Sequence, residues 1–346
     1  MENKKKTLSL NILSQYKSEI YGLSILWIML FHSYLSDVYF FKDEPVLRYI
    51  GRIICYGNMG VEVFLLLSGV CLYFSYIKNP SPVSFMKKRL VRLIPSVIVI
   101  RGGFWLWQYF QGKITLSRAL FSMTTLRFWF TGDGEIWFIP LILLCYAMYP
   151  YIYGYLFEKE EGTTRRFLLL FFVVVGFTFL ARASDPSDYA RIEIGLTRIP
   201  VFLIGCWLGK YVYEKKEISR CWWPVFAIMA LLCFVVLEQG ILEDIYKRYF
   251  YMVGGVSMTF LFAGFSACAG KTIRKILTFF GGISLELYLA HLMVRKMNVA
   301  GLLFSYEPGH TKKYLLVLVI SVGVAWVASR LIDFLRKNVR LNKKKL

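Results

Sequence analysis

Ten stretches of about 20 predominantly apolar residues constrain the fold of this chain more than any other feature. Inside hydrocarbon no water is present to bond to a backbone N–H or C=O, so each stretch has to form a helix. With 57% hydrophobic residues and a mean hydropathy of +0.52 over 346 residues, little chain is left for a soluble domain. We therefore expect an all-α integral membrane protein of about ten transmembrane helices, and exclude a cytosolic enzyme or a secreted disulfide scaffold.

Apolar periodicity also sets the domain organisation. The stretch from Ile114 to Phe130 is amphipathic and is predicted to lie at the membrane interface. Residues 19–335 are expected to form one membrane domain between a basic segment, 1–18, and a basic tail, 336–346. The first span lacks a small-residue cleavage site and is interpreted as a signal anchor. The predicted spans are 19–39, 53–77, 90–110, 135–157, 166–182, 195–213, 222–240, 249–269, 276–297 and 314–335.

The net charge of +20 follows the same topology. Lys4, Lys5 and Lys6 precede the first span, which predicts cytoplasmic N- and C-termini. Of the 42 Lys and Arg residues, 25 then fall on inner segments and 15 on outer ones, whereas carboxylates are more frequent outside. The charge is therefore a topology signal, strengthened by anionic lipid, and it implies no nucleic-acid partner. The seven cysteines show no C-x-x-C spacing, and we expect no metal site.

Polar residues within the spans are the candidates for function, because each is costly in lipid and usually faces a cavity or a partner. His32 and Glu62 reach similar depths at a rise of about 1.5 Å per residue, so these two side chains could meet. His291 falls in the outer leaflet and could line the same cavity. The candidates are His32 in the first span, Glu62 and Ser68 in the second, Arg101 in the third, and Glu286 and His291 in the ninth.

Packing offers an alternative for each candidate, and for His32 function is favoured over that alternative. Glu62 could be neutral packing, and a buried histidine often only hydrogen-bonds between helices. Arg101 could pair with Glu62 or extend outward. For Glu286 a structural pairing is preferred, and Ser68 could simply permit close helix contact.

A basic motif precedes the third span on the predicted cytoplasmic side. Arg89 and Arg92 are three residues apart and share one helix face, next to Lys87 and Lys88. Two guanidinium groups suit a ligand that carries phosphate, because each can donate two parallel hydrogen bonds. An anchor to lipid headgroups is the alternative. Pro95, expected near the start of the span, fixes the approach geometry and favours the ligand.

Taken together, these segments resemble the acyltransferase 3 family of multispanning membrane O-acyltransferases. The likeness covers most of the chain in five stretches: 22–32, 60–69, 88–95, 136–139 with Tyr146 and Pro150, and 282–291. It implies a multi-pass protein of the bacterial inner membrane that passes an acyl group, usually acetyl, from cytoplasmic acyl-CoA to a hydroxyl of an envelope glycan.

The resemblance also implies roles for single residues. His32 corresponds to the family's leading catalytic histidine, and Arg89 and Arg92 correspond to arginines needed for activity. Tyr21 stands where the family commonly has arginine, and Lys17 or Arg101 could substitute for it.

Acyl transfer from a thioester to an alcohol needs a base, and His32 suits that task. Glu62 could orient its ring, and an acyl-histidine intermediate would also fit. Arg101, Tyr288 and Trp137 are candidate donors to the oxyanion. Arg89, Arg92 and Lys88 would hold the phosphates of CoA. The alternatives are a solute transporter or flippase with a proton-relaying His/Glu pair, and a membrane scaffold.

Overall fold

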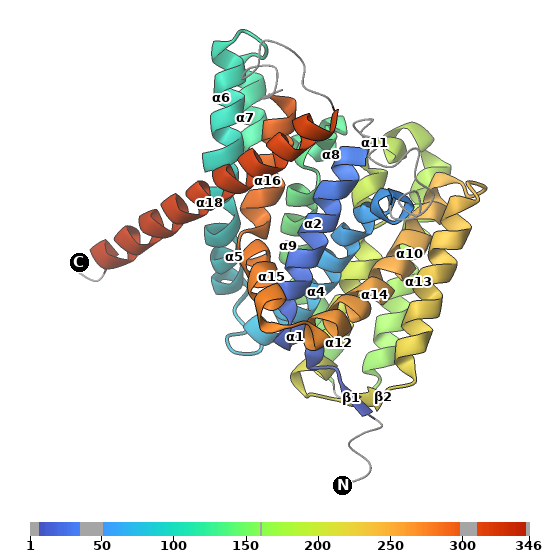
Figure 1. The fold of residues 1–346 in the computed structure, drawn as a ribbon. Coiled ribbons are helices and arrows are strands. Elements are labelled where there is room, and N and C mark those ends of the chain that lie inside the picture. Colours follow the sequence, from blue (N-terminus) through green and yellow to red (C-terminus); the bar gives the residue numbers. More distant parts are fainter. Residues whose placement is uncertain (1–6, 35–50, 160, 298–309, 344–346) are drawn as a thin grey trace.

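The computed structural model describes residues 7–34, 51–159, 161–297 and 310–343, and these residues are almost entirely helical (Figure 1). Residues 35–39 of the first predicted span and the outer parts of the basic termini, 1–6 and 344–346, lie outside this description.

The elements are β1 (Thr7–Ser9), α1 (Ile12–Gln15), α2 (Lys17–Tyr34), η2 (Gly57–Met59), α4 (Gly60–Tyr76), α5 (Pro82–Ser96), η3 (Val97–Gly102), α6 (Gly103–Phe110), α7 (Leu116–Met123), α8 (Arg127–Thr131), η4 (Gly134–Ile136), α9 (Phe138–Phe157), α10 (Thr163–Ser184), α11 (Pro186–Leu196), α12 (Ile199–Tyr213), β2 (Glu217–Ser219), α13 (Trp222–Glu238), α14 (Asp244–Cys268), α15 (Lys271–Gly282), α16 (Ser284–Lys296) and α18 (His310–Lys343).

Over the described residues, each of the ten predicted spans falls on one helix or on consecutive helical segments, which confirms the class of helical membrane protein. Within the described residues, seven helices are long and apolar enough to cross a membrane, or up to eight if α15 and α16 form one span. The count of ten and the cytoplasmic placement of both termini therefore remain predictions. One small correction to the all-α class is an antiparallel pair of three-residue strands, β1 and β2.

Three predicted segments differ in detail from the observed helices. Pro95 does not start the third span: α5 begins at Pro82, and Pro95 lies inside a helix that continues to Phe110. The ninth span is bent by 69° between α15 and α16. The amphipathic segment 114–130 is divided into α7 and α8 near Thr125, which has a positive φ of 63°.

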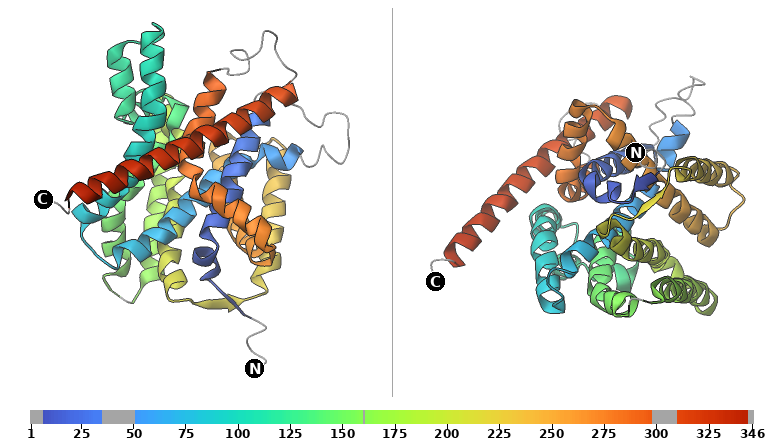
Figure 2. Two further views of the ribbon diagram at one scale, coloured as in Figure 1. Left: turned by 60° about the vertical axis from the view of Figure 1, so that its left-hand side comes forward. Right: turned by 90° about the horizontal axis from the view of Figure 1, so that it is seen from below.

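Contacts between distant segments agree with the prediction that successive connections between the spans lie alternately on the inner and the outer side. β1 pairs with β2, and Arg336 donates to the backbone carbonyl of Arg92, so segments assigned to the inner side meet one another. At the opposite end, Arg248 contacts Glu193 and Lys296 contacts Glu135, all on segments assigned to the outer side. The views in Figures 1 and 2 show β1 and β2 at one end of the bundle and α8 and α11 at the other.

Helix α4 is the most deeply buried of the candidate spans and packs against α12, α2 and α14. Glycines allow the closest of these contacts, since a Cβ on Gly205 would overlap the backbone of Leu66, and one on Gly69 would crowd Phe202 and Cys206. Helix α18 crosses the outside of the bundle and extends past it (Figures 1 and 2). Helix α2 contacts both α4 and α16, so these three helices lie near one another.

Candidate active site

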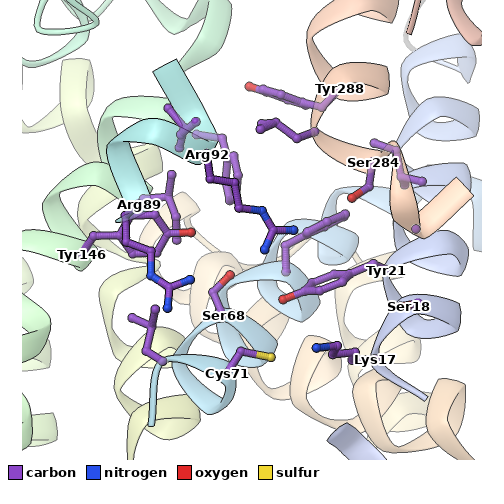
Figure 3. Close-up of a pocket in the computed structure, with 18 of the residues that line it drawn as sticks. Lys17, Ser18, Tyr21, Ser68, Cys71, Arg89, Arg92, Tyr146, Ser284 and Tyr288 are labelled. Atoms are coloured by element: carbon purple, nitrogen blue, oxygen red, sulfur yellow. The ribbon is translucent and has the colours of Figure 1, made fainter. Parts of the chain in front are cut away.

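A cavity of about 590 Å³, here called the basic cavity, lies between α2, α4, α5, α9 and α16 (Figure 3). None of the described residues that line it is a carboxylate, so its positive charge is not neutralised from within. Figure 3 shows the guanidinium groups of Arg89 and Arg92 and the amine of Lys17 directed toward one central space. The cationic residues lining it are Lys17, Lys78, Lys88, Arg89 and Arg92.

Local structure places the two arginines on one face, as predicted. Ser81 caps α5 by accepting from the backbone N–H of Ser84, and Pro82 occupies the first turn, so the basic motif is helical from its start. The Arg89 guanidinium lies 5.0 Å from the ring centre of Phe85 and 5.8 Å from that of Tyr146. These aromatic faces hold the charge in position.

Tyr21 and Ser68 also line the basic cavity. Tyr21 stacks on Phe64 with ring centres 4.9 Å apart. Of the two proposed substitutes for an arginine at this position, Lys17 lies one helical turn earlier in the same cavity, whereas Arg101 lines a different one. The close helix contact predicted for Ser68 is made by its neighbour Gly69.

A second cavity of about 520 Å³, here called the histidine cavity, is lined by His32. Arg101, Trp137 and Tyr288, the predicted oxyanion donors, line it together with His32. The two cavities have three lining residues in common, Ile28, Val61 and Tyr288. The basic motif and His32 therefore face spaces that share a wall.

His32 on α2 and His291 on α16 are in direct contact. Nδ1 of His32 lies 2.8 Å from Nε2 of His291, and the rings stack with centres 4.9 Å apart. Nδ1 of His291 lies 2.9 Å from the backbone carbonyl of Leu287. Arg295 donates to the backbone carbonyl of His32 at 3.3 Å.

Glu62 does not orient His32, and that predicted pairing is wrong. Its carboxylate lies 3.0 Å from Nε of Arg198, and the two side chains are 1% and 3% exposed. Similar depth on two helices does not ensure contact, because each helix can be rotated about its axis. Glu62 faces α12 and α14, where Gly255 leaves space beside its Cβ.

Arg101 does not pair with Glu62, and its side chain does not extend outward to solvent. It lies in the π-helical turn that follows Pro95, is fully buried, and pairs with Glu135. Glu135 also pairs with Lys296, so two cations share one carboxylate. Nε and Nη1 of Arg101 have no hydrogen-bond partner among the described residues. A π-helical turn inside an α-helix is frequently found at functional sites.

The remaining candidates are placed as follows. Glu286 accepts a 2.7 Å hydrogen bond from the hydroxyl of Ser96, which agrees with its preferred structural role. Trp137 carries the Arg198 guanidinium 4.7 Å above its ring centre. Across the described parts of the chain, no group of three or more His, Cys, Asp or Glu side chains is arranged to hold a metal ion.

Sequence reasoning missed Arg198, Glu135 and Lys296 as parts of this site. All three are charged residues near the ends of predicted spans, where sequence alone does not distinguish them from loop charges. The low apolarity at the start of the 195–213 span, where Arg198 precedes Pro200, could have indicated Arg198; no comparable signal marks Glu135 or Lys296.

Comparison with known proteins gives two findings. A family model described as an acyltransferase domain matches residues 22–330. A protein named O-acetyl transferase, from Shigella phage Sf6, is 23% identical over 207 residues, which cover 54% of this chain and 60% of that protein. The chain thus matches less than two thirds of that relative's length. No solved structure matches the chain.

Proposed function

The chain belongs to the acyltransferase family whose model it matches, and on this premise we propose that it is a membrane O-acyltransferase. In this proposal an acyl group, most simply acetyl, passes from cytoplasmic acyl-CoA to a hydroxyl of an envelope or extracellular glycan. The protein then resides in the bacterial inner membrane, with residues 19–335 as its catalytic domain. The name of the phage relative, O-acetyl transferase, supports the acetyl group and the hydroxyl acceptor.

The wall shared by the two cavities is the observation that carries this proposal. A donor held by the cations of the basic cavity needs to present its thioester to His32 in the neighbouring cavity. Ile28, Val61 and Tyr288 border both spaces, so the thioester end of the donor has only this wall to cross. The bilayer core is about 30 Å thick, so an extended donor anchored at the inner side can reach its middle.

The donor's phosphates are assigned to Arg89, Arg92 and Lys88, with Lys17 contributing on the opposite side of the cavity. Guanidinium groups donate to phosphate oxygens in pairs, and the lining has no described carboxylate to compete for them. The apolar remainder of the lining, such as Ile25 and Leu72, suits the uncharged arm of the donor.

The reaction proposed for the histidine cavity is general-base catalysis. The acceptor oxygen attacks the thioester carbonyl while its proton passes to His32. The C–S bond then breaks, and the leaving thiolate takes up that proton. Arg101, Tyr288 and Trp137 can stabilise the oxyanion between these steps, and Nε and Nη1 of Arg101 have no partner among the described residues and can donate to it.

A transporter with a proton-relaying His/Glu pair was the alternative from sequence. Its central feature would be contact between His32 and Glu62, but Glu62 instead forms an ion pair with Arg198. The geometry therefore supports the acyltransferase better.

Inverted membrane vesicles supplied with radiolabelled acetyl-CoA test the proposal. We expect label in a glycan or on the protein, lost in His32→Ala and retained in Lys87→Gln, which changes a described residue that lines neither cavity. Solute counterflow without any transfer of label would reject the acyltransferase and favour the transporter.

A further inference from the structure

The contact between His32 and His291 fixes where protons lie. The backbone carbonyl of Leu287 can only accept a hydrogen bond, so Nδ1 of His291, 2.9 Å away, has to carry a proton. A neutral imidazole has one N–H group and one lone pair. Nε2 of a neutral His291 is therefore an acceptor.

The same logic extends to His32. Its Nδ1 lies 2.8 Å from Nε2 of His291, a distance at which two lone pairs would repel each other. Nδ1 of His32 therefore carries the proton and donates to His291. In neutral His32 the second nitrogen, Nε2, then has the lone pair, and His32 lines the histidine cavity while His291 is 3% exposed.

We propose that His291 is a positioning residue that holds His32 in the tautomer with a basic Nε2. This inference rests on the proposed acyltransferase function. In the reaction, Nε2 of His32 takes the proton of the acceptor hydroxyl as the acceptor oxygen bonds to the acyl carbon. The C–S bond breaks next, and the thiolate of CoA removes the proton from Nε2.

His291 also stabilises the charged form of His32. Once Nε2 is protonated, the Nδ1–H of the imidazolium donates a charge-assisted hydrogen bond to His291, about twice as strong as a neutral one. Before the reaction both rings are neutral, so the pair avoids the cost of a buried charge in the membrane interior. A neutral imidazole thus fills the place that a carboxylate holds in the serine-protease triad.

Three substitutions at position 291 separate positioning from packing. Glutamine places its amide oxygen near the position of Nε2, where it can accept from His32. Asparagine is shorter, so its amide can hydrogen-bond to the Leu287 carbonyl but cannot reach His32. Leucine fills the space without any hydrogen bond.

We expect kcat to fall by about 10²- to 10⁴-fold in His291→Leu and His291→Asn, the upper value being the effect of a wrong tautomer in a serine protease. The KM for acetyl-CoA should not change, and His291→Gln should stay within about tenfold of the wild type. A His291→Leu variant with wild-type kcat, or a Gln variant no better than Asn, would overturn the proposal.

Nitrogen-15 NMR of histidine-labelled protein in bilayers gives a readout that needs no activity. The chain has three histidines, so His310→Gln and His291→Gln suffice to assign His32. We expect Nδ1 of His32 to be protonated and Nε2 unprotonated, with this preference lost in His291→Leu. Protonation at Nε2 in the wild type would refute the inference. The expected tautomer in a protein that transfers no acyl group would support His291 as the positioning residue and reject only the proposed function.

Discussion

At the scale of single residues, the ion pair between Glu62 and Arg198 joins α4 to α12 in the interior of the protein. Taking two charges out of water is costly, and their mutual attraction offsets that cost only while both are present. Glu135 has a similar position between Arg101 and Lys296. These carboxylates pair with arginines and a lysine around the histidine cavity.

Replacing Glu62 by glutamine should therefore destabilise the protein by about 3–5 kcal/mol, because Arg198 is left as an unpaired buried charge. Thermal unfolding in detergent measures this. The double variant Glu62→Leu/Arg198→Met should recover most of the loss, since it removes both charges and keeps apolar volume. Wild-type stability combined with a reduced kcat in Glu62→Gln would instead return Glu62 to the catalytic chemistry.

Replacing Arg89 and Arg92 together by glutamine should raise the KM for acetyl-CoA by more than about tenfold, because a hydrogen bond to a charged group contributes about 1.5–3 kcal/mol. Lys87→Gln is the matched control, since Lys87 lies on the same helix but does not line the basic cavity. Steady-state kinetics with acetyl-CoA as the varied substrate check both variants. A KM unchanged in the double variant would leave the arginines with lipid headgroups as their partners.

At the scale of helices, two irregularities shape the site. Pro95 lacks the N–H that a continuous α-helix needs, and the π-helical turn that follows carries Arg101 into the interior. The bend between α15 and α16 directs α16, with Tyr288 and His291, toward α2. Close packing of α4 on α12 depends on Gly69 and Gly205, because either Cβ would meet backbone atoms of the facing helix.

Gly205→Ala should destabilise the protein by about 1–3 kcal/mol or more, since the facing atoms are backbone and cannot rotate away. Gly176→Ala in α10 is the matched control, because a Cβ there meets nothing within 4 Å. That change should be neutral or stabilise by up to about 1 kcal/mol, as expected for alanine in a helix interior. Thermal unfolding of both variants decides the matter, and equal effects would refute the close packing of α4 on α12.

At the scale of the whole molecule, two cavities lie in series along the bundle. The basic cavity opens among segments assigned to the inner side, and the histidine cavity lies among Glu135, Arg248 and Lys296, assigned to the outer side. In the proposed reaction, the donor and the acceptor would approach from opposite faces and meet at the wall formed by Ile28, Val61 and Tyr288.

Val61→Phe should place a larger side chain between the two cavities and reduce acetyl transfer by at least about tenfold. A thioester displaced by about 1 Å from the reacting centre can cost 10²-fold in rate. Equilibrium binding of acetyl-CoA should persist, since the phosphate-binding side chains are unchanged. Val61→Ala should keep both properties. Full transfer by Val61→Phe protein that binds acetyl-CoA would show that the donor does not pass this wall.

The helical membrane class, the approximate positions of the helices, the basic face formed by Arg89 and Arg92, and the family could all be predicted from the order of the residues. These properties follow from apolar length, from a fixed rise per residue and from spacing within one helix. Spacing is local information, so no knowledge of neighbouring helices is needed to read it.

Which side chains meet depends on the packing of the helices in three dimensions. Depth along α2 and α4 suggested that His32 and Glu62 could pair, but rotation of each helix directs His32 to His291 and Glu62 to Arg198. That rotation is set by packing with α12, α14 and α16, helices that are distant in the sequence. The wall between the two cavities depends on the same long-range packing, and spacing along a single chain does not contain it.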